Sequence, residues 1–146
     1  GNNPLIVKGV EDIDAAVHDI IQSAFITSGQ RCTCSRKLFL ANDAQGDAIL
    51  ARLIEVTKAI KVGHYDAEDQ PFMGAMISAR AASQMVAAQS QLLAQGASSL
   101  VELTHTDQTT GFVTPVIIDV TNIIHSISIL SNLFLLLETP STYTTS

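Results

Sequence analysis

A thiol in a short polar turn is the side chain best placed for chemistry in this sequence. Cys32 lies in the segment Gly-Gln-Arg-Cys-Thr-Cys at 29–34, between a helical pattern that ends near Phe25 and a strand-like run at 37–40. A turn between two packed elements can present a nucleophile to a cleft, where it meets its substrate. An ordinary cysteine is only a few per cent thiolate at neutral pH, so a reactive one needs a neighbour that favours the thiolate. Arg31, directly before Cys32, is such a neighbour.

The same two cysteines have other interpretations. Free cysteine is among the most buried residue types, so Cys32 and Cys34 also fit as small apolar residues of the core. If the segment were extended, side chains two positions apart would share a face, and both thiols would lie on the same face. One of the two could then be structural and the other exposed. A dithiol redox protein is a further alternative, but pairing across one intervening residue is geometrically strained.

The sequence contains no pattern typical of a metal or phosphate site. Zinc sites usually combine cysteines two to four residues apart with closely spaced histidines, whereas here the histidines are scattered; they are His18, His64, His105 and His125. We therefore predict no metal site. Neither Gly-x-Gly-x-x-Gly nor Gly-x-x-x-x-Gly-Lys-Ser/Thr occurs, so the pattern predicts no phosphate-binding loop.

Composition excludes several classes of partner. With 146 residues, 47% of them hydrophobic and 15% charged, the chain is typical of one globular domain. A net charge of -6 and only eight Lys and Arg residues argue against a nucleic-acid partner. The apolar run at 123–137 is interrupted by polar residues and is shorter than the ~20 residues of a membrane span. No secretion signal is visible, and we predict a cytoplasmic protein without a membrane partner.

Alternating strand and helix patterns indicate an α/β fold with a largely parallel sheet. Acidic Asp12 and the hydroxyl of Ser78 are suited to begin helices, and Gly63 and Gly96 to end them. The expected strands are 5–7, 37–40, 100–103 and 112–120, and the expected helices begin near 12, 47 and 78.

Three segments together resemble the catalytic domain of the aldehyde dehydrogenase superfamily. They are Gly-Asn-Asn-Pro-Leu-Ile-Val at 1–7, Gly-Gln-Arg-Cys-Thr at 29–33 and Pro-Phe-Met-Gly-Ala-Met-Ile-Ser at 71–78. The turn is most similar to the branch of the superfamily that oxidises N-succinylglutamate 5-semialdehyde in arginine catabolism. The resemblance covers 1–122 and implies an incomplete catalytic domain with three α/β/α layers.

The resemblance assigns a role to each residue of the turn. It implies that Cys32 adds to the aldehyde carbon, and that the Cys32 backbone N–H and a side-chain amide hold the oxyanion of the thiohemiacetal. Hydride then passes to NAD, and a glutamate activates the water that hydrolyses the thioester. Arg31 and Thr33 are implied to bind substrate, with Arg31 facing a carboxylate of a dicarboxylic aldehyde. A solvated or ion-paired Arg31 is the alternative.

The sequence also departs from the family pattern. The family's glutamate precedes the second glycine of Glu-Leu-Gly-Gly, which corresponds to Gly1. The resemblance therefore implies that the base and the dinucleotide-binding domain, the expected partner of this chain, lie outside residues 1–146. We predict no cofactor-binding residues here, no activity of the isolated chain, and a homo-oligomer for the full-length enzyme. Ala75 replaces a proline common in the family, which puts the rigidity of its loop in doubt.

The resemblance stops at Asn122, and residues 123–146 form a divergent tail. We hypothesise that this tail is an out-of-frame or unrelated reading, because both the family motif and its acidic composition disappear. The sequence predicts a short apolar helix or disorder for the tail, with the last eight residues loose. A truncated, non-enzymatic module that associates through its apolar faces is the alternative function.

Overall fold

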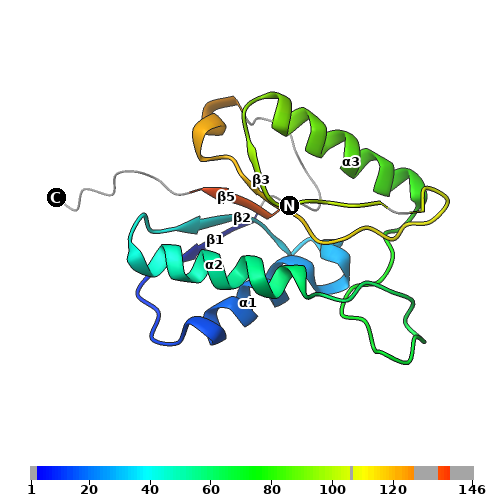
Figure 1. Cartoon of the computed structure of the whole chain (residues 1–146), viewed down its shortest axis with the longest axis horizontal. Coiled ribbons are helices and arrows are strands. Elements are labelled where there is room, and N and C mark those ends of the chain that lie inside the picture. The colour runs from blue at the N-terminus through cyan, green and yellow to red at the C-terminus, as the bar shows by residue number, and fades with distance from the viewer. Residues whose placement is uncertain (1–2, 106, 127–134, 139–146) are drawn as a thin grey trace.

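The chain forms one mixed sheet with helices on both faces (Figure 1). The structure is a computed structural model and describes residues 3–105, 107–126 and 135–138. The strands are β1 (Asn3–Val7), β2 (Ser35–Leu40), β3 (Ser98–Val101), β4 (Ile117–Asp119) and β5 (Leu135–Glu138). The helices are α1 (Ile13–Phe25), α2 (Ala44–Lys58) and α3 (Ala79–Ala94), with short 3-10 turns η1 (Ile26–Gly29) and η2 (Thr121–Ser126).

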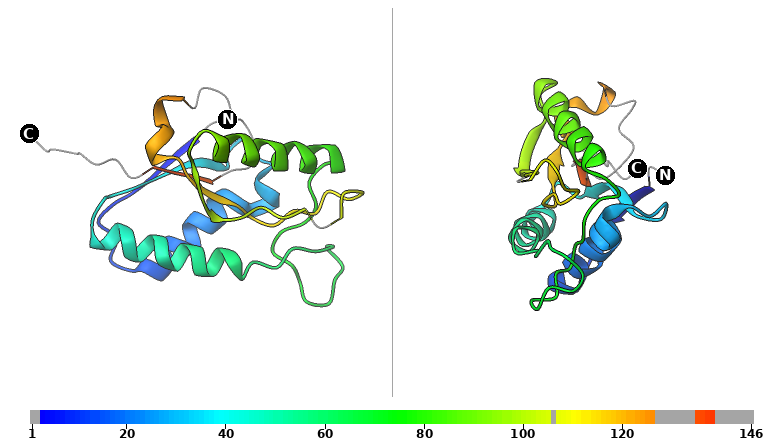
Figure 2. Two further views of the ribbon diagram at one scale, coloured as in Figure 1. Left: turned by 45° about the horizontal axis from the view of Figure 1, so that its top comes forward. Right: turned by 90° about the vertical axis from the view of Figure 1, so that its right-hand side faces the viewer.

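The sheet is largely parallel, as the sequence predicted. Its strand order is β1-β2-β5-β4-β3, and three of its four pairs are parallel. Among the strands that the structure describes, only β3 runs antiparallel to its neighbour, β4. Figure 2 shows α1 and α2 on one face of the sheet and α3 on the other, which gives the expected three α/β/α layers.

Each face of the sheet carries its own apolar core. Ile117 and Ile118 of β4 are both fully buried and point to opposite faces, as alternation along a strand requires. The core under α1 and α2 includes Val17, Ile20, Phe25, Leu38, Leu40, Ile49, Leu53 and Leu137. The core under α3 includes Met76, Ala82, Met85, Leu92, Val113, Val116 and Val120.

Local capping explains where the three helices begin. Asp12 accepts a hydrogen bond from Ala15 N at 3.0 Å, and Ser78 accepts one from Ala81 N at 3.1 Å. Both caps were predicted. α2 begins at Ala44, three residues earlier than expected, because Asp43 accepts a hydrogen bond from Gly46 N at 2.8 Å.

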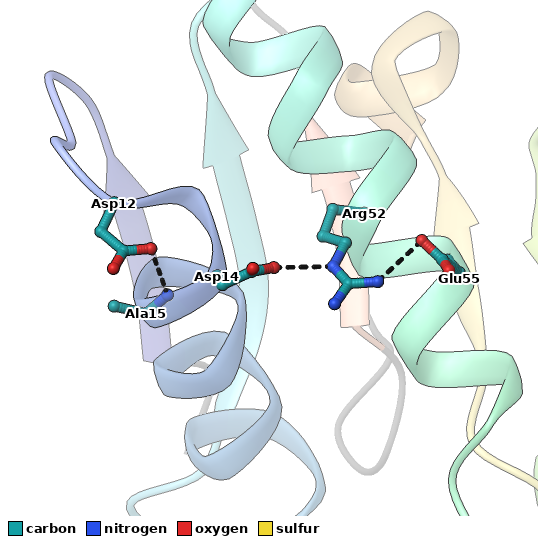
Figure 3. A network of polar contacts seen from close by, with 5 residues as sticks. All are labelled: Asp12, Asp14, Ala15, Arg52 and Glu55. Carbon is teal, nitrogen blue, oxygen red and sulfur yellow. Dashed lines mark hydrogen bonds and ion pairs between the residues drawn. The ribbon is translucent and has the colours of Figure 1, made fainter.

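One exposed ion-pair network joins the two helices on the same face. Arg52 Nε of α2 lies 2.7 Å from Asp14 Oδ1 of α1, and its Nη1 lies 2.8 Å from Glu55 Oε2 (Figure 3). Hydrogen bonds from Arg52 to Asp14 and Glu55 raise the pKa of Arg52 above its ordinary value. Because all three side chains are well exposed, solvent screens these ion pairs, and the network adds little to the stability of the packing between α1 and α2.

Gln89 is the polar exception on the inner face of α3, and the structure explains it. Its side chain is buried, and its Oε1 accepts a hydrogen bond from Leu103 N at 2.9 Å. Its Nε2 donates to Leu103 O at 3.4 Å. Both polar atoms of the amide therefore satisfy backbone groups that follow β3.

The last two predicted strands were placed inaccurately. β3 begins at Ser98 and ends at Val101, and β4 covers only 117–119 of the expected 112–120. Residues 112–116 instead follow an irregular path in which Thr114 N donates to Thr104 O. Pro115 has no N–H to donate to a ladder, which fits this shortening.

The tail supplies a central strand. β5 lies between β2 and β4 and pairs in parallel with both, and Leu137 is fully buried in the core under α1 and α2. The predicted apolar helix is therefore wrong at residues 135–138. A strand is favoured there because it satisfies the backbone groups of both neighbours. The predicted disorder and loose last eight residues fall on 127–134 and 139–146, which lie outside the described residues.

Candidate active site

The two thiols lie in different surroundings. Cys34 N donates to Arg31 O at 3.2 Å, so residues 31–34 form a turn and not an extended strand. Cys32 is exposed, whereas Cys34 is only 2% exposed and its Sγ faces Ile26 O at 3.7 Å. The predicted turn is confirmed, and with it the possibility that one cysteine is structural and the other exposed. The extended alternative, with both thiols on one face, does not apply, because a turn does not alternate its side chains as a strand does.

A left-handed backbone segment directs the chain from α1 into this turn. Thr27, Ser28 and Gly29 all have positive φ, at 52°, 53° and 64°. The conformation costs about 1 kcal/mol or more for each residue with a side chain, so neighbouring contacts must hold it in place. Ser28 provides one such contact, since its buried Oγ donates to Gly74 O at 2.8 Å.

Gln30 fastens the turn to a second loop. Its Oε1 accepts from Ile77 N at 2.9 Å, and its Nε2 donates to Ala75 O at 3.4 Å. Residues 71–78 lie at the same end of the molecule as the turn (Figure 1), although more than forty residues separate them in sequence. The backbone at Ala75 is thus held by Gln30. Sequence reasoning missed Ser28 and Gln30, because no spacing signal links 28–30 to 74–77.

Arg31 and Thr33 both border an open hollow beside the turn. The hollow has a volume of about 450 Å³ and is lined by Asp19, Gln22, Ser23, Ile26, Arg31, Thr33 and Cys34. The C-terminal half of α1 therefore forms one wall and the turn forms the other. Arg31 is exposed and makes no ion pair with any described residue. Cys32 is not among the lining residues and lies on the exposed side of the same turn.

A buried guanidinium lies next to the turn. Arg36 is 5% exposed, and its Nη2 donates to Arg31 O at 3.4 Å. Burial lowers the pKa of Arg36 below its ordinary value, and the neighbouring Cys34 thiol acts in the opposite direction. The Nε of Arg36 has no hydrogen-bond partner among the described residues. The turn thus has a positive charge beneath it.

The described histidines are not gathered around a common centre. His18 lies 3.5 Å from Asp19, His64 contacts Asp66, and His105 Nε2 lies 2.8 Å from Thr110 O. Within the described ranges, no three His, Cys, Asp or Glu side chains come together in an arrangement able to hold a metal ion. None of the helices described is both long enough and apolar enough to cross a bilayer.

Comparisons with known proteins place the chain in a family. The model of the aldehyde dehydrogenase family matches residues 1–128. N-succinylglutamate 5-semialdehyde dehydrogenase of Paraburkholderia xenovorans (strain LB400) is 59% identical over 123 residues, 84% of this chain. The matched region is 25% of the length of that enzyme.

Solved structures share the fold. Succinate-semialdehyde dehydrogenase from Burkholderia pseudomallei superposes with a TM-score of 0.81 at 25% identity, over 97% of this chain and 30% of that enzyme. The NADP complex of an NADP-dependent glyceraldehyde-3-phosphate dehydrogenase from Bacillus halodurans C-125 superposes with a TM-score of 0.75 at 21% identity. That match covers 97% of this chain and 29% of the other. By its sequence along residues 1–128, this chain belongs to the aldehyde dehydrogenase family.

Proposed function

We propose that Cys32 is the nucleophile of an aldehyde dehydrogenase that oxidises N-succinylglutamate 5-semialdehyde to N-succinylglutamate with NAD. The observation that carries the proposal is the position of Cys32, an exposed thiol on a turn held between α1, β2 and the 71–78 loop. The identity of 59% to an enzyme named for this substrate supports it. NADP is the alternative cofactor, as in the solved glyceraldehyde-3-phosphate dehydrogenase complex.

The first step is an addition that this chain's own residues can perform. The Cys32 sulfur forms a bond to the aldehyde carbon, the π electrons of the carbonyl move to its oxygen, and the thiol proton ends on that oxygen. The product is a thiohemiacetal, and the Cys32 backbone N–H donates to its oxygen. A bound nicotinamide cofactor would accept the hydride that converts this adduct to a thioester.

Arg31 and Thr33 are proposed to bind the rest of the substrate. The substrate carries carboxylates, and a guanidinium can hold a carboxylate with two parallel hydrogen bonds. Arg31 has no competing ion pair among the described residues and borders a hollow of about 450 Å³. Asp19 lies on the opposite wall of the hollow, 3.5 Å from Nδ1 of His18.

The proposed enzyme extends beyond this chain. Since the chain spans 25% of its curated relative, we place the dinucleotide-binding domain and the water-activating base in other parts of the enzyme. The isolated chain is therefore proposed to form the covalent adduct without turning over. We also propose a cytoplasmic homo-oligomer that serves arginine catabolism.

The test follows the adduct directly. Succinate semialdehyde labelled with ¹³C at its aldehyde carbon, added to the chain, should give a thiohemiacetal signal in the ¹³C spectrum. Cys32→Ser should abolish the signal, whereas Cys34→Ser, the matched control, should retain it. The serine hydroxyl introduced in that control can still donate to Ile26 O. An adduct that persists in Cys32→Ser would refute the assignment of the nucleophile.

Two further measurements test whether Arg31 binds the substrate carboxylate and whether the chain alone can turn over. Arg31→Met should weaken the adduct with succinate semialdehyde about tenfold, in line with a charged hydrogen bond, and leave that with neutral butyraldehyde unchanged. Equal weakening with both aldehydes would contradict carboxylate binding by Arg31. Sustained reduction of NAD or NADP by the chain alone would refute its proposed inactivity.

A non-enzymatic module that associates through apolar surface is the second candidate. Ile6 on the edge strand β1 is 69% exposed, and Ile77 beside the Cys32 turn is 87% exposed. Light scattering separates the two candidates: a monomer that forms the aldehyde adduct favours the enzyme, and an aggregate that forms none favours the module.

A further inference from the structure

The backbone carbonyl groups of the turn are fixed by hydrogen bonds. Arg31 O accepts from Cys34 N at 3.2 Å and from Arg36 Nη2 at 3.4 Å. The carbonyl oxygens of Cys32 and Cys34 both accept from a single amide nitrogen, Nδ2 of Asn3, at 2.6 Å and 3.1 Å. Asn3 begins β1 and lies 29 residues before Cys32. One side chain from β1 therefore clamps two carbonyl groups of a distant turn.

These contacts determine both soft dihedral angles of Cys32. Each peptide group is planar, so fixing the direction of a carbonyl fixes the whole group. The peptide group before Cys32 contains Arg31 O, which Cys34 and Arg36 hold. The peptide group after it contains Cys32 O, which Asn3 holds. The contacts of Arg31 O therefore restrict rotation about the N–Cα bond of Cys32. The hydrogen bond from Asn3 restricts rotation about its Cα–C bond.

The same contacts determine the direction of the Cys32 N–H. In a trans peptide group the N–H points opposite to the carbonyl. Arg31 O is directed toward Cys34 and Arg36, both buried, so the Cys32 N–H is directed away from them. This N–H makes no hydrogen bond with any residue in the described part of the chain. Among the described residues it is therefore an unpaired donor, and it lies next to an exposed thiol.

We propose that Asn3 is a positioning residue for the reaction of Cys32. By holding Cys32 O and Cys34 O, it fixes the thiol relative to the free Cys32 N–H, so that sulfur can attack a carbonyl carbon while the N–H receives the carbonyl oxygen. The inference rests on the proposed function of Cys32 as a nucleophile. Asn3 itself touches neither substrate nor sulfur in this arrangement and acts through the backbone.

The distinguishing measurement compares two reactions of the same thiol. Addition to the ¹³C-labelled semialdehyde develops negative charge on an oxygen and benefits from the oriented N–H. Alkylation by iodoacetamide is a displacement at a methylene carbon and develops no such oxygen. For Asn3→Leu, which keeps similar volume without donors, we expect the adduct to weaken roughly five- to tenfold, as the loss of a hydrogen bond implies. The alkylation rate of Cys32 should stay within about twofold of the parent rate.

Further variants keep the test decisive. Asn3→Gln retains the amide donor and should form the aldehyde adduct with most of the parent's affinity. Asn3→Asp offers only acceptor atoms and should form the weakest adduct of the three variants. Asn42→Ala is the matched control, because Asn42 is exposed and outside the turn. Alkylation of Cys34, buried in the parent chain, reports loss of the fold.

Each outcome has one meaning. If the parent chain forms no adduct, the proposed function fails and the role of Asn3 fails with it. If the parent forms the adduct and the leucine and aspartate variants form it equally well, Cys32 is a nucleophile and Asn3 does not position it. If every Asn3 variant exposes Cys34 to alkylation, Asn3 stabilises the fold and the proposal is overturned as well.

Discussion

Gly111→Ala should displace the 71–78 loop, which Gln30 holds against the Cys32 turn. A Cβ at Gly111 would lie 2.5 Å from Met76 O, 3.1 Å from Met76 N and 3.2 Å from Met76 C. All three are backbone atoms, so no side chain can rotate away. Met76 O must retreat by about 0.9 Å to reach ordinary contact at 3.4 Å. Met76 N also donates to Gly111 O at 2.8 Å, and that hydrogen bond would lengthen.

The expected cost follows from these contacts. Overpacking of a buried site typically costs about 1–3 kcal/mol, and a weakened hydrogen bond adds up to about 1 kcal/mol. The displaced loop includes Ala75 and Ile77, which Gln30 holds against the turn. We therefore expect the free energy of unfolding to fall by about 2–4 kcal/mol, and we expect amide exchange at Cys34 to accelerate.

Urea unfolding followed by circular dichroism checks the first expectation, with Gly74→Ala as the matched control. Gly74 lies in the 71–78 loop, the loop of Met76; it has no positive φ, and an added Cβ there would meet nothing within 4 Å. Both substitutions reduce the entropy of the unfolded chain alike, so their difference isolates the contact with Met76. We expect Gly74→Ala to change stability by less than about 0.5 kcal/mol. Equal stability of the two variants would refute the reasoning.

Three other substitutions test separate parts of the fold. Gly46→Ala should lower the free energy of unfolding in urea by more than about 1 kcal/mol, because the new Cβ would lie 1.9 Å from Ala41 O. This loss is expected although alanine is the better helix former. A variant more stable than the parent would contradict the expectation. Leu137→Ala should cost about 2–5 kcal/mol, since β5 buries this side chain completely, and a cost below about 1 kcal/mol would argue against a central β5. Hydrogen bonds from Thr109 lower the pKa of Asp107 in the folded chain below its ordinary value of 3.8. The ionised carboxylate therefore stabilises the folded chain at pH values above 3.8. This stabilisation is lost as the pH falls through the pKa that Asp107 has in the folded chain. Asp107→Asn should therefore differ from the parent in thermal stability at pH 7 and converge with it in acid, and a constant difference would contradict the assignment.

Features that depend on residues close together in the sequence, such as helix caps and helix faces, could be predicted from the sequence. The Asp12 and Ser78 caps and the apolar spacing of α1 were readable, because a cap bonds to an N–H three residues away and a helix face repeats every turn. The α/β class followed from the alternation of such elements. The family was recognised from the 1–7, 29–33 and 71–78 motifs, and the match over 1–128 confirms it.

Features that depend on contacts between distant residues were not readable. The sequence predicted the turn at 29–34, but it did not indicate which of the two thiols is buried and which is exposed. The support from Asn3 and Gln30 joins segments 29 to 47 residues apart. β5 was missed because a short leucine run has no period of its own, and only the space between β2 and β4 selects a strand there.

The origin of the tail stays a hypothesis. An out-of-frame reading predicts that a single-base shift in the coding DNA across codons 118–130 restores the family motif. A clean frame in which no such shift restores it would contradict that hypothesis.

The central claim is that Cys32 is an accessible nucleophile that reacts with aldehydes. Native iodoacetamide labelling followed by peptide mapping, with and without succinate semialdehyde, tests it most directly. We expect alkylation at Cys32 and none at Cys34. The alkylation of Cys32 should become progressively slower as the concentration of the aldehyde is raised. Labelling of Cys32 at the same rate whether or not the aldehyde is present would contradict the account.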